Sequence, residues 1–171
     1  GWSTGFDQGL TTLSLVQGEA LGGGFESALS AGVVVAEESS RMGFPEILFN
    51  LFPGMGAYSL LIRKVGRRIA DELITSGNIY TARQLFDLGV VDVLAPDGAG
   101  EATVYSFIKK HARAANGRRG IEAARREVEP LTLDELMRVV NVWSDAALRL
   151  NERDLRMMER LVRAQNRTAE F

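Results

Sequence analysis

Cysteine is absent from the 171 residues of this chain, and histidine occurs only once. Without cysteine there are no disulfides, no thiolate nucleophiles and no sulfur-ligated metal sites. The single histidine, His111, has no Asp or Glu at a spacing that would orient it, which argues against a Ser-His-Asp triad and against a zinc site. The acidic residues also lack EF-hand spacing, so we predict no metal ion.

Charge of one sign and long apolar runs are lacking as well. The 20 Lys and Arg residues nearly balance the 22 Asp and Glu residues, for a formal net charge of -2. This balance gives no bulk electrostatic reason to expect a nucleic acid or an anionic membrane as a partner. No apolar run approaches the roughly 20 residues of a membrane span, and the first residues show no charged and then apolar leader, so we expect a cytoplasmic protein.

Short apolar runs between glycines predict an α/β fold. Residues 11–16 and 33–36 are β-branched and apolar, as expected of buried strands, and a helical stretch separates them. Residues 90–94 indicate a third strand of the same kind. Strand, helix and strand in this order are typical of a parallel sheet.

Helices are predicted between and after these strands. Apolar residues at helical spacing indicate helices at residues 47–51, 60–65, 69–74 and 82–88, and from about residue 101 to the end. For the helix at 82–88, Thr81 is the expected N-cap and Gly89 the expected stop. We therefore divide the chain into an α/β part at residues 1–100 and a helical region at residues 101–171.

The residues most suited to chemistry surround a glycine triplet, Gly22, Gly23 and Gly24. The triplet stands where a predicted strand meets a predicted helix, so the backbone can approach a ligand and the first helical amides point at it. This arrangement suits an anion or a developing oxyanion, although an ordinary tight turn uses the same residues. The spacing is not GxGxxG and no Gly-Lys-Ser/Thr follows, so a nucleotide-binding loop is not indicated.

Two glutamates complete the candidate site. Glu26 follows Gly23 by three residues and falls in the first helical turn, where a carboxylate also complements the helix dipole. Glu46 lies in the apolar stretch MGFPEI at residues 42–47, where burial would raise its pKa, although Pro-Glu is also a common helix start. Two carboxylates beside an amide cradle are suited to moving protons next to a thioester carbonyl.

With these residues the sequence resembles the crotonase (enoyl-CoA hydratase/isomerase) superfamily. The segments that carry the resemblance are QGEALGGGFE at 17–26, MGFPE at 42–46, PGMG at 53–56, ITSGN at 74–78 and LGVVD at 88–92. Two further segments most resemble the diffusible signal factor synthases, FNLFPGMGAYS at 49–59 and RLVRAQNR at 160–167. Those are bacterial enzymes that turn 3-hydroxyacyl carrier-protein thioesters into cis-2-unsaturated fatty acid signals.

The resemblance implies roles for individual residues and an architecture. The Gly23 amide would be an oxyanion-hole donor, with Glu26 and Glu46 as the acid and base, and the resemblance leaves open which glutamate is the acid. The implied fold is the second half of the crotonase spiral core, followed by helices that cover the site and build a homotrimer or a dimer of trimers. No cofactor is implied beyond the coenzyme A or acyl carrier protein of the fatty acyl thioester.

The resemblance also implies a missing part. The family's second oxyanion amide lies in an earlier segment of the fold, which this sequence does not contain. Three parallel strands are also few for 171 residues, so we expect an N-terminal half of the fold to precede residue 1. Losing one oxyanion donor typically costs about 10²–10³ in rate, so we expect these residues alone to be impaired.

Further residues are candidates for contact with the substrate. They are two members of the glycine triplet and five other residues, namely Gly22, Gly24, Phe25, Gly54, Met55, Trp143 and Leu161. Met and aromatic side chains shape adaptable apolar pockets, although most such residues belong to a plain core. Met55 stands out because it sits in a glycine-rich loop close to Glu46, where packing alone would not require it.

The sequence therefore predicts an enzyme of acyl thioester chemistry. The main interpretation is a dehydratase that converts 3-hydroxyacyl thioesters to 2-enoyl products and releases a cis-2-unsaturated acid, as the signal factor synthases do. The alternatives are a conventional enoyl-CoA hydratase/isomerase of fatty-acid breakdown and a non-catalytic acyl-binding protein with the same fold.

Overall fold

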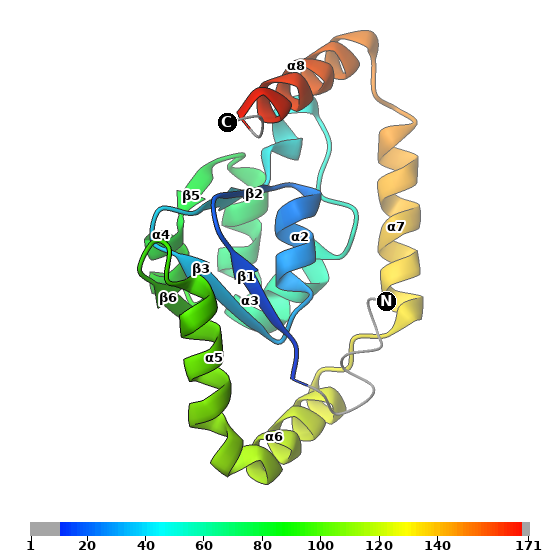
Figure 1. The fold of residues 1–171 in the computed structure, drawn as a ribbon. Coiled ribbons are helices and arrows are strands. Elements are labelled where there is room, and N and C mark those ends of the chain that lie inside the picture. Colours follow the sequence, from blue (N-terminus) through cyan, green and yellow to red (C-terminus); the bar gives the residue numbers. More distant parts are fainter. Residues whose placement is uncertain (1–10, 169–171) are drawn as a thin grey trace.

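The computed structural model describes residues 11–168, and Figure 1 shows an α/β core with an arm of helices around it. The core contains two small sheets of three strands each. This is the mixed α/β architecture, followed by a helical tail, that the sequence predicts.

The first sheet is parallel, with the strand order β1-β3-β6. Its strands are β1 (Leu13–Val16), β3 (Val33–Glu37) and β6 (Val93–Ala95). The middle strand, β3, is buried along its whole length, which explains why its sequence is an apolar run without alternation. The three predicted parallel strands are confirmed, although the last begins at residue 93 and not at residue 90.

The second sheet joins three very short strands in the order β2-β4-β5. They are β2 (Glu19–Leu21), β4 (Arg41–Gly43) and β5 (Ile79–Thr81), with β4 parallel to β2 and antiparallel to β5. Gly43 is required at this place because the backbone carbonyl of Asn78 occupies the space of a Cβ. The sequence did not predict this sheet, since three residues are too few to show an alternating pattern.

Helix α2 (Gly23–Leu29) follows β2, and the 3-10 helix η1 (Pro45–Phe49) follows β4. The span of α3 (Ala57–Thr75) covers both helices predicted at 60–65 and 69–74. Gly66 has a non-helical backbone, with φ 78 and ψ 166, so α3 consists of two helical parts that meet at a kink. The predicted break at Gly66 is therefore confirmed, although no loop separates the two parts.

Helix α4 (Ala82–Asp87) begins as the sequence predicts. The Thr81 hydroxyl accepts from the Gln84 amide, and the Gln84 side chain accepts from the Thr81 amide, so the two residues form a capping box. At the other end, Gly89 has a φ of 83, which is the left-handed conformation of a helix stop.

The core packs α2, α3 and α4 against the sheets. At its centre the rings of Phe25 and Phe44 stack with centroids 4.8 Å apart and planes inclined by 22°, and neither side chain is exposed. Phe25 immediately precedes Glu26, and Phe44 precedes Glu46 by two residues. The ring pair therefore ties together the two segments that carry the candidate glutamates.

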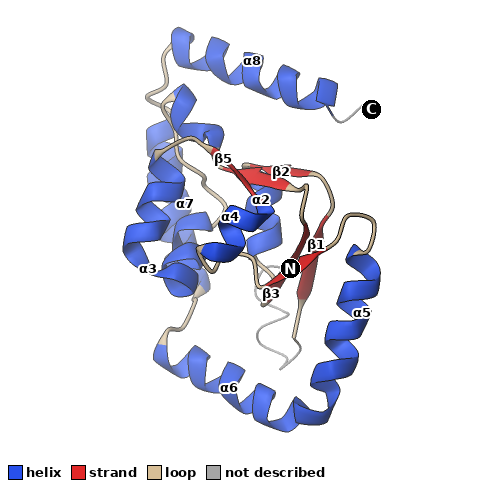
Figure 2. Cartoon of the chain, turned by 90° about the vertical axis from the view of Figure 1, so that its left-hand side faces the viewer, coloured by secondary structure: helices blue, strands red, loops and turns tan. Residues whose placement is uncertain are grey.

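The arm runs around the edge of the core, as Figures 1 and 2 show. Its elements are α5 (Gly100–His111), η2 (Ala112–Ala114), α6 (Ala115–Val128), α7 (Leu133–Ala147) and α8 (Glu152–Thr168). Helix α5 packs its Val104 and Phe107 on the parallel sheet, and α8 packs on η1.

The apolar spacing in the arm predicted helices correctly but not a buried face. Helices α6 and α7 have no buried residue within the described part of the chain, and Leu148 is 85% exposed. None of the helices between residues 11 and 168 has the length and apolar character of a membrane span.

Candidate active site

The glycine triplet joins β2 to α2, as predicted. Gly22 is the N-cap residue, with a φ of 54 and a ψ of -123, a conformation that side-chain-bearing residues rarely adopt. This turn starts the helix at Gly23 and places Glu26 in its first turn. The Glu26 side chain points inward and is only 2% exposed.

Two backbone amides hold the Glu26 carboxylate. Its Oε1 accepts hydrogen bonds from the N–H of Met55 at 2.7 Å and from the N–H of Ala57 at 3.1 Å. Ala57 is the first residue of α3, where amides have no acceptor within the helix, and Met55 lies two residues before it. Burial raises the pKa of Glu26, and the two amide bonds oppose that increase because they favour the ionised form.

Glu46 lies on η1, with its carboxylate against the backbone of the triplet. A Cβ added to Gly22 would lie 2.6 Å from Glu46 Oε1, so any larger residue at position 22 would displace this carboxylate from its observed position. The other oxygen, Oε2, is buried and has no hydrogen-bond partner among the described residues. Burial, aided by the negative charge of Glu26 and opposed by a bond from Glu46's own backbone amide, raises the pKa of Glu46 to about 7.

Both glutamates lie beside the triplet, as the sequence predicts. Glu46 Oε1 lies against Gly22, and Glu26 is in the first turn of the helix that Gly22 caps. The negative charge of Glu26 also contributes to the raised pKa of Glu46. The Gly23 N–H opens helix α2 and has no acceptor within that helix. Next to it, Met55 Sδ lies 3.6 Å from the position that a Gly23 Cβ would take. This site therefore gathers two carboxyl groups, a helix-opening amide and an apolar side chain.

Trp143 reaches this region from the arm. Its indole ring covers Gly54, so closely that a Cβ at Gly54 would overlap the ring. Met55, the next residue, is 48% exposed. The structure thus brings Gly54, Met55 and Trp143 together near the glutamates, and their contact with a substrate stays a prediction.

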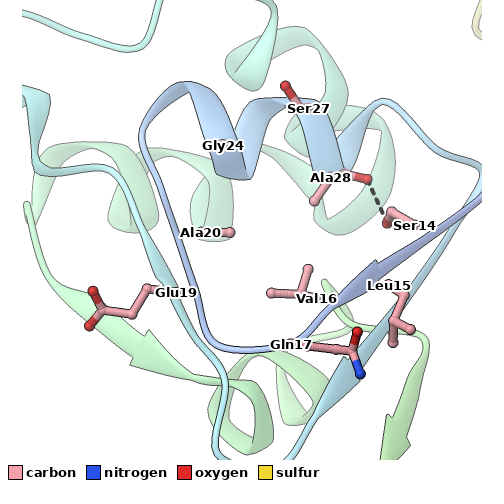
Figure 3. Close-up of a pocket in the computed structure, with 9 residues that line it drawn as sticks. All are labelled: Ser14, Leu15, Val16, Gln17, Glu19, Ala20, Gly24, Ser27 and Ala28. Atoms are coloured by element: carbon pink, nitrogen blue, oxygen red, sulfur yellow. Dashed lines mark hydrogen bonds between the residues drawn. The ribbon is translucent and has the colours of Figure 1, made fainter. Parts of the chain in front are cut away.

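Gly24 lies in a separate, wide hollow, shown in Figure 3. This cavity of about 500 Å³ runs along β1, β2 and α2. Its lining residues are Ser14, Leu15, Val16, Gln17, Glu19, Ala20, Gly24, Ser27 and Ala28. Gly24 therefore faces a different space from the other two members of the triplet.

Two further candidates for substrate contact lie elsewhere. The prediction that Phe25 contacts the substrate needs correction. Its ring is fully buried in the stack with Phe44 and is part of the core, not of a binding surface. Leu161 is half-buried on α8, the helix that packs on η1. Its role in binding also stays a prediction.

Sequence reasoning missed the backbone partners of the site. The amides of Met55 and Ala57 bond Glu26. Nearly every residue has such an amide, so the sequence does not indicate which ones bond a side chain. The only available signal was the pair of glycines in PGMG at 53–56, which marks a place where backbone is accessible. Between residues 11 and 168, no three His, Cys, Asp or Glu side chains gather as a metal site requires.

Comparison with known proteins finds similarity to enoyl-CoA hydratases and isomerases. The family model of enoyl-CoA hydratase/isomerase matches residues 1–139. The chain is 43% identical over 84 residues to a 2,3-dehydroadipyl-CoA hydratase of Escherichia coli K12, which covers 49% of this chain and 33% of that protein. It is 41% identical over 88 residues to the enoyl-CoA isomerase/hydratase fer4 of Mycosarcoma maydis, covering 51% of this chain and 32% of that protein.

Solved structures show the same fold. A crystal structure of an enoyl-CoA hydratase from Mycobacterium avium subsp. paratuberculosis K-10 superposes with a TM-score of 0.78 at 22% identity, over 95% of this chain and 67% of that one. The matched segment spans about a third of the length of the two curated relatives, 33% and 32%. Because the family model covers most of the sequence, the chain belongs to the enoyl-CoA hydratase/isomerase family.

Proposed function

We propose that this chain supplies the acid and the base of an enzyme that adds water to 2-enoyl thioesters and, in reverse, dehydrates 3-hydroxyacyl thioesters. The proposal is supported by family membership and by one observation above all. Two glutamates beside the glycine triplet have unlike surroundings: Glu26 is buried and bonded to two amides, and Glu46 is partly buried with one buried oxygen that has no partner among the described residues. Carboxyl groups in unlike environments take different protonation states, which acid-base catalysis requires.

We assign the two roles from the surroundings of each carboxyl group. Burial raises the pKa of Glu26, but its two amide bonds oppose that increase and favour the carboxylate, so we take Glu26 as the base. Glu46, with a pKa of about 7, retains a proton near neutral pH and is the acid. In hydration, water oxygen forms a bond to C3 while Glu26 takes a water proton, and Glu46 gives its proton to C2. The Gly23 N–H donates to the thioester oxygen while that oxygen carries negative charge.

Coenzyme A is the proposed thioester carrier. Both curated relatives described above are named for reactions of CoA thioesters. Met55 lies over Gly23 and is half exposed, so it is placed to contact the acyl carbons next to the carbonyl. We therefore propose an enoyl-CoA as the substrate class.

A signal factor synthase is the second candidate, and the likeness of residues 49–59 to those enzymes favours it. Such an enzyme also releases the acid from its thioester, which requires a water molecule to attack the carbonyl carbon and the thiol of the carrier to leave. The two functions differ in their product. A hydratase returns 3-hydroxyacyl-CoA, whereas the synthase yields a free 2-enoic acid.

The test is hydration of crotonyl-CoA by the full-length protein. The reaction is measured as the loss of the absorbance of the enoyl thioester. We expect Glu26→Gln and Glu46→Gln each to lower kcat by about 10²–10⁴. The matched control is Glu72→Gln, the same chemical change at an exposed carboxyl on α3. Full activity in both active-site variants would refute the proposed roles of the two glutamates. Binding of acyl chains without turnover, unchanged in both variants, would favour a non-catalytic acyl-binding protein. Release of free acid from 3-hydroxyacyl carrier protein would favour the synthase.

A further inference from the structure

One arginine fastens the arm to the core. The Arg63 guanidinium on α3 bonds both oxygens of Glu135 on α7, at 2.9 and 2.7 Å. It also donates to the backbone carbonyls of Ser59 at 3.0 Å, Pro130 at 2.8 Å and Glu129 at 3.3 Å. All five guanidinium N–H donors are therefore used, and four of these bonds reach the start of α7 or the turn before it.

The same arm helix contacts the loop that leads into α3. Trp143 lies eight residues after Glu135, about two helical turns further along α7. Its indole covers Gly54, where no side chain larger than hydrogen fits. Helix α7 is thus attached to α3 at one point and to the preceding loop at another.

Helix α7 therefore contacts both ends of the segment that bonds Glu26, at Gly54 and at Arg63. From Gly54 the chain passes through Met55 and Ala57, whose amides bond Glu26 Oε1, and enters α3. Six residues beyond Ala57 is Arg63. The loop is therefore fixed from inside by Glu26 and from outside by α7.

We propose that Arg63, Glu135 and Trp143 are positioning residues, which hold helix α7 against the loop so that the Met55 and Ala57 amides stay on Glu26. Glu135 and Arg63 orient the helix, and Trp143 presses on the loop. None of the three needs to touch the substrate. The catalytic consequence rests on the proposed function, whereas the effect on the amides does not.

The direct test is hydrogen exchange at single amides, measured by NMR on the full-length protein. In Arg63→Met and in Trp143→Ala we expect the amides of Met55 and Ala57 to exchange at least about tenfold faster than in the wild type. The amide of Val35, at the centre of β3, reports global unfolding and should not change. Trp143→Phe retains a flat ring and should restore protection.

Lys64→Met is the matched control. Lys64 is the next residue on α3 and also forms a salt bridge to a distant part of the chain, with Asp92 at 2.7 Å, but no hydrogen bond or ion pair joins it to α7 in the described structure. Its loss should leave Met55 and Ala57 protected. The proposal is overturned if Lys64→Met accelerates these two amides as much as Arg63→Met, if Val35 accelerates in parallel with them, or if they stay protected in both arm variants.

Activity separates this proposal from the function itself. If the wild type hydrates crotonyl-CoA, kcat should fall about tenfold in Arg63→Met and Trp143→Ala but not in Lys64→Met, because a small misplacement of a catalytic group lowers the rate strongly. A wild type without hydratase activity would refute the proposed function alone. The exchange rates would still decide the role of the arm.

Discussion

Glu46→Gln should make the folded protein more stable at high pH and leave it almost unchanged at low pH. Burial raises the pKa of Glu46 from its usual 4.5 to about 7. The folded state therefore binds a proton more tightly than the unfolded state, and wild-type stability falls as pH rises from 4.5 to about 7. The difference in pKa corresponds to about 3 kcal/mol, at about 1.4 kcal/mol per pH unit.

Glutamine has nearly the same shape as glutamate and carries no charge at any pH, so the variant lacks this loss. The free energy of unfolding of Glu46→Gln, relative to that of the wild type, should therefore increase by about 3 kcal/mol between pH 4 and pH 8. Any pH-independent effect of the amide shifts this difference equally at every pH and does not change the increase. This is a large share of the 5–15 kcal/mol that typically separates folded and unfolded states, as an order of magnitude.

Urea denaturation of both proteins at half-unit pH intervals measures this difference. Glu72→Gln makes the same change at an exposed carboxyl and controls for the substitution itself. Parallel stability curves for wild type and Glu46→Gln from pH 4 to pH 8 would refute the reasoning. They would mean that the Glu46 carboxylate is solvated or paired in the folded protein.

Three other predictions follow from the site and its frame. Hydration and dehydration should both slow as pH rises through about 7, because each needs one proton on the pair of Glu26 and Glu46, and a flat rate from pH 6 to 9 would contradict this. Gly22→Ala should cost about 1–3 kcal/mol in denaturation and lower kcat, since it strains a φ of 54 and displaces Glu46, and wild-type stability would count against it. Thr81→Ala should cost about 1 kcal/mol through loss of the cap on α4, so an unchanged urea midpoint would exclude the capping role.

The parallel sheet could be predicted because its middle strand is buried on both faces. Such a strand must be apolar throughout, and the run Val33, Val34, Val35 and Ala36 shows it directly. The second sheet could not be predicted, because its strands are only three residues long and depend on close approaches such as Gly43 to Asn78. Contacts of that kind are tertiary and leave no periodic pattern.

The candidate site was predictable in part. The triplet and the two glutamates could be recognised from their spacing, and the structure brings them together. Phe25 shows the limit, because an apolar residue beside a catalytic candidate fits a pocket wall and a core equally well by sequence. The bonds between Arg63 and the start of α7 were also invisible, since they join residues about 70 positions apart through side-chain geometry.

The two oxygens of Glu26 have different neighbours, and this affects how the residue can be changed. Both amide bonds end on Oε1, so one atom of the proposed base also accepts from the first residue of α3 and from Met55 just before the helix. Replacement by alanine would remove that acceptor and unsettle the helix along with the chemistry, whereas glutamine keeps an oxygen that can stay in place. Any redesign that gives this scaffold a new reaction without a carboxylate at position 26 must provide another acceptor for the opening of that helix.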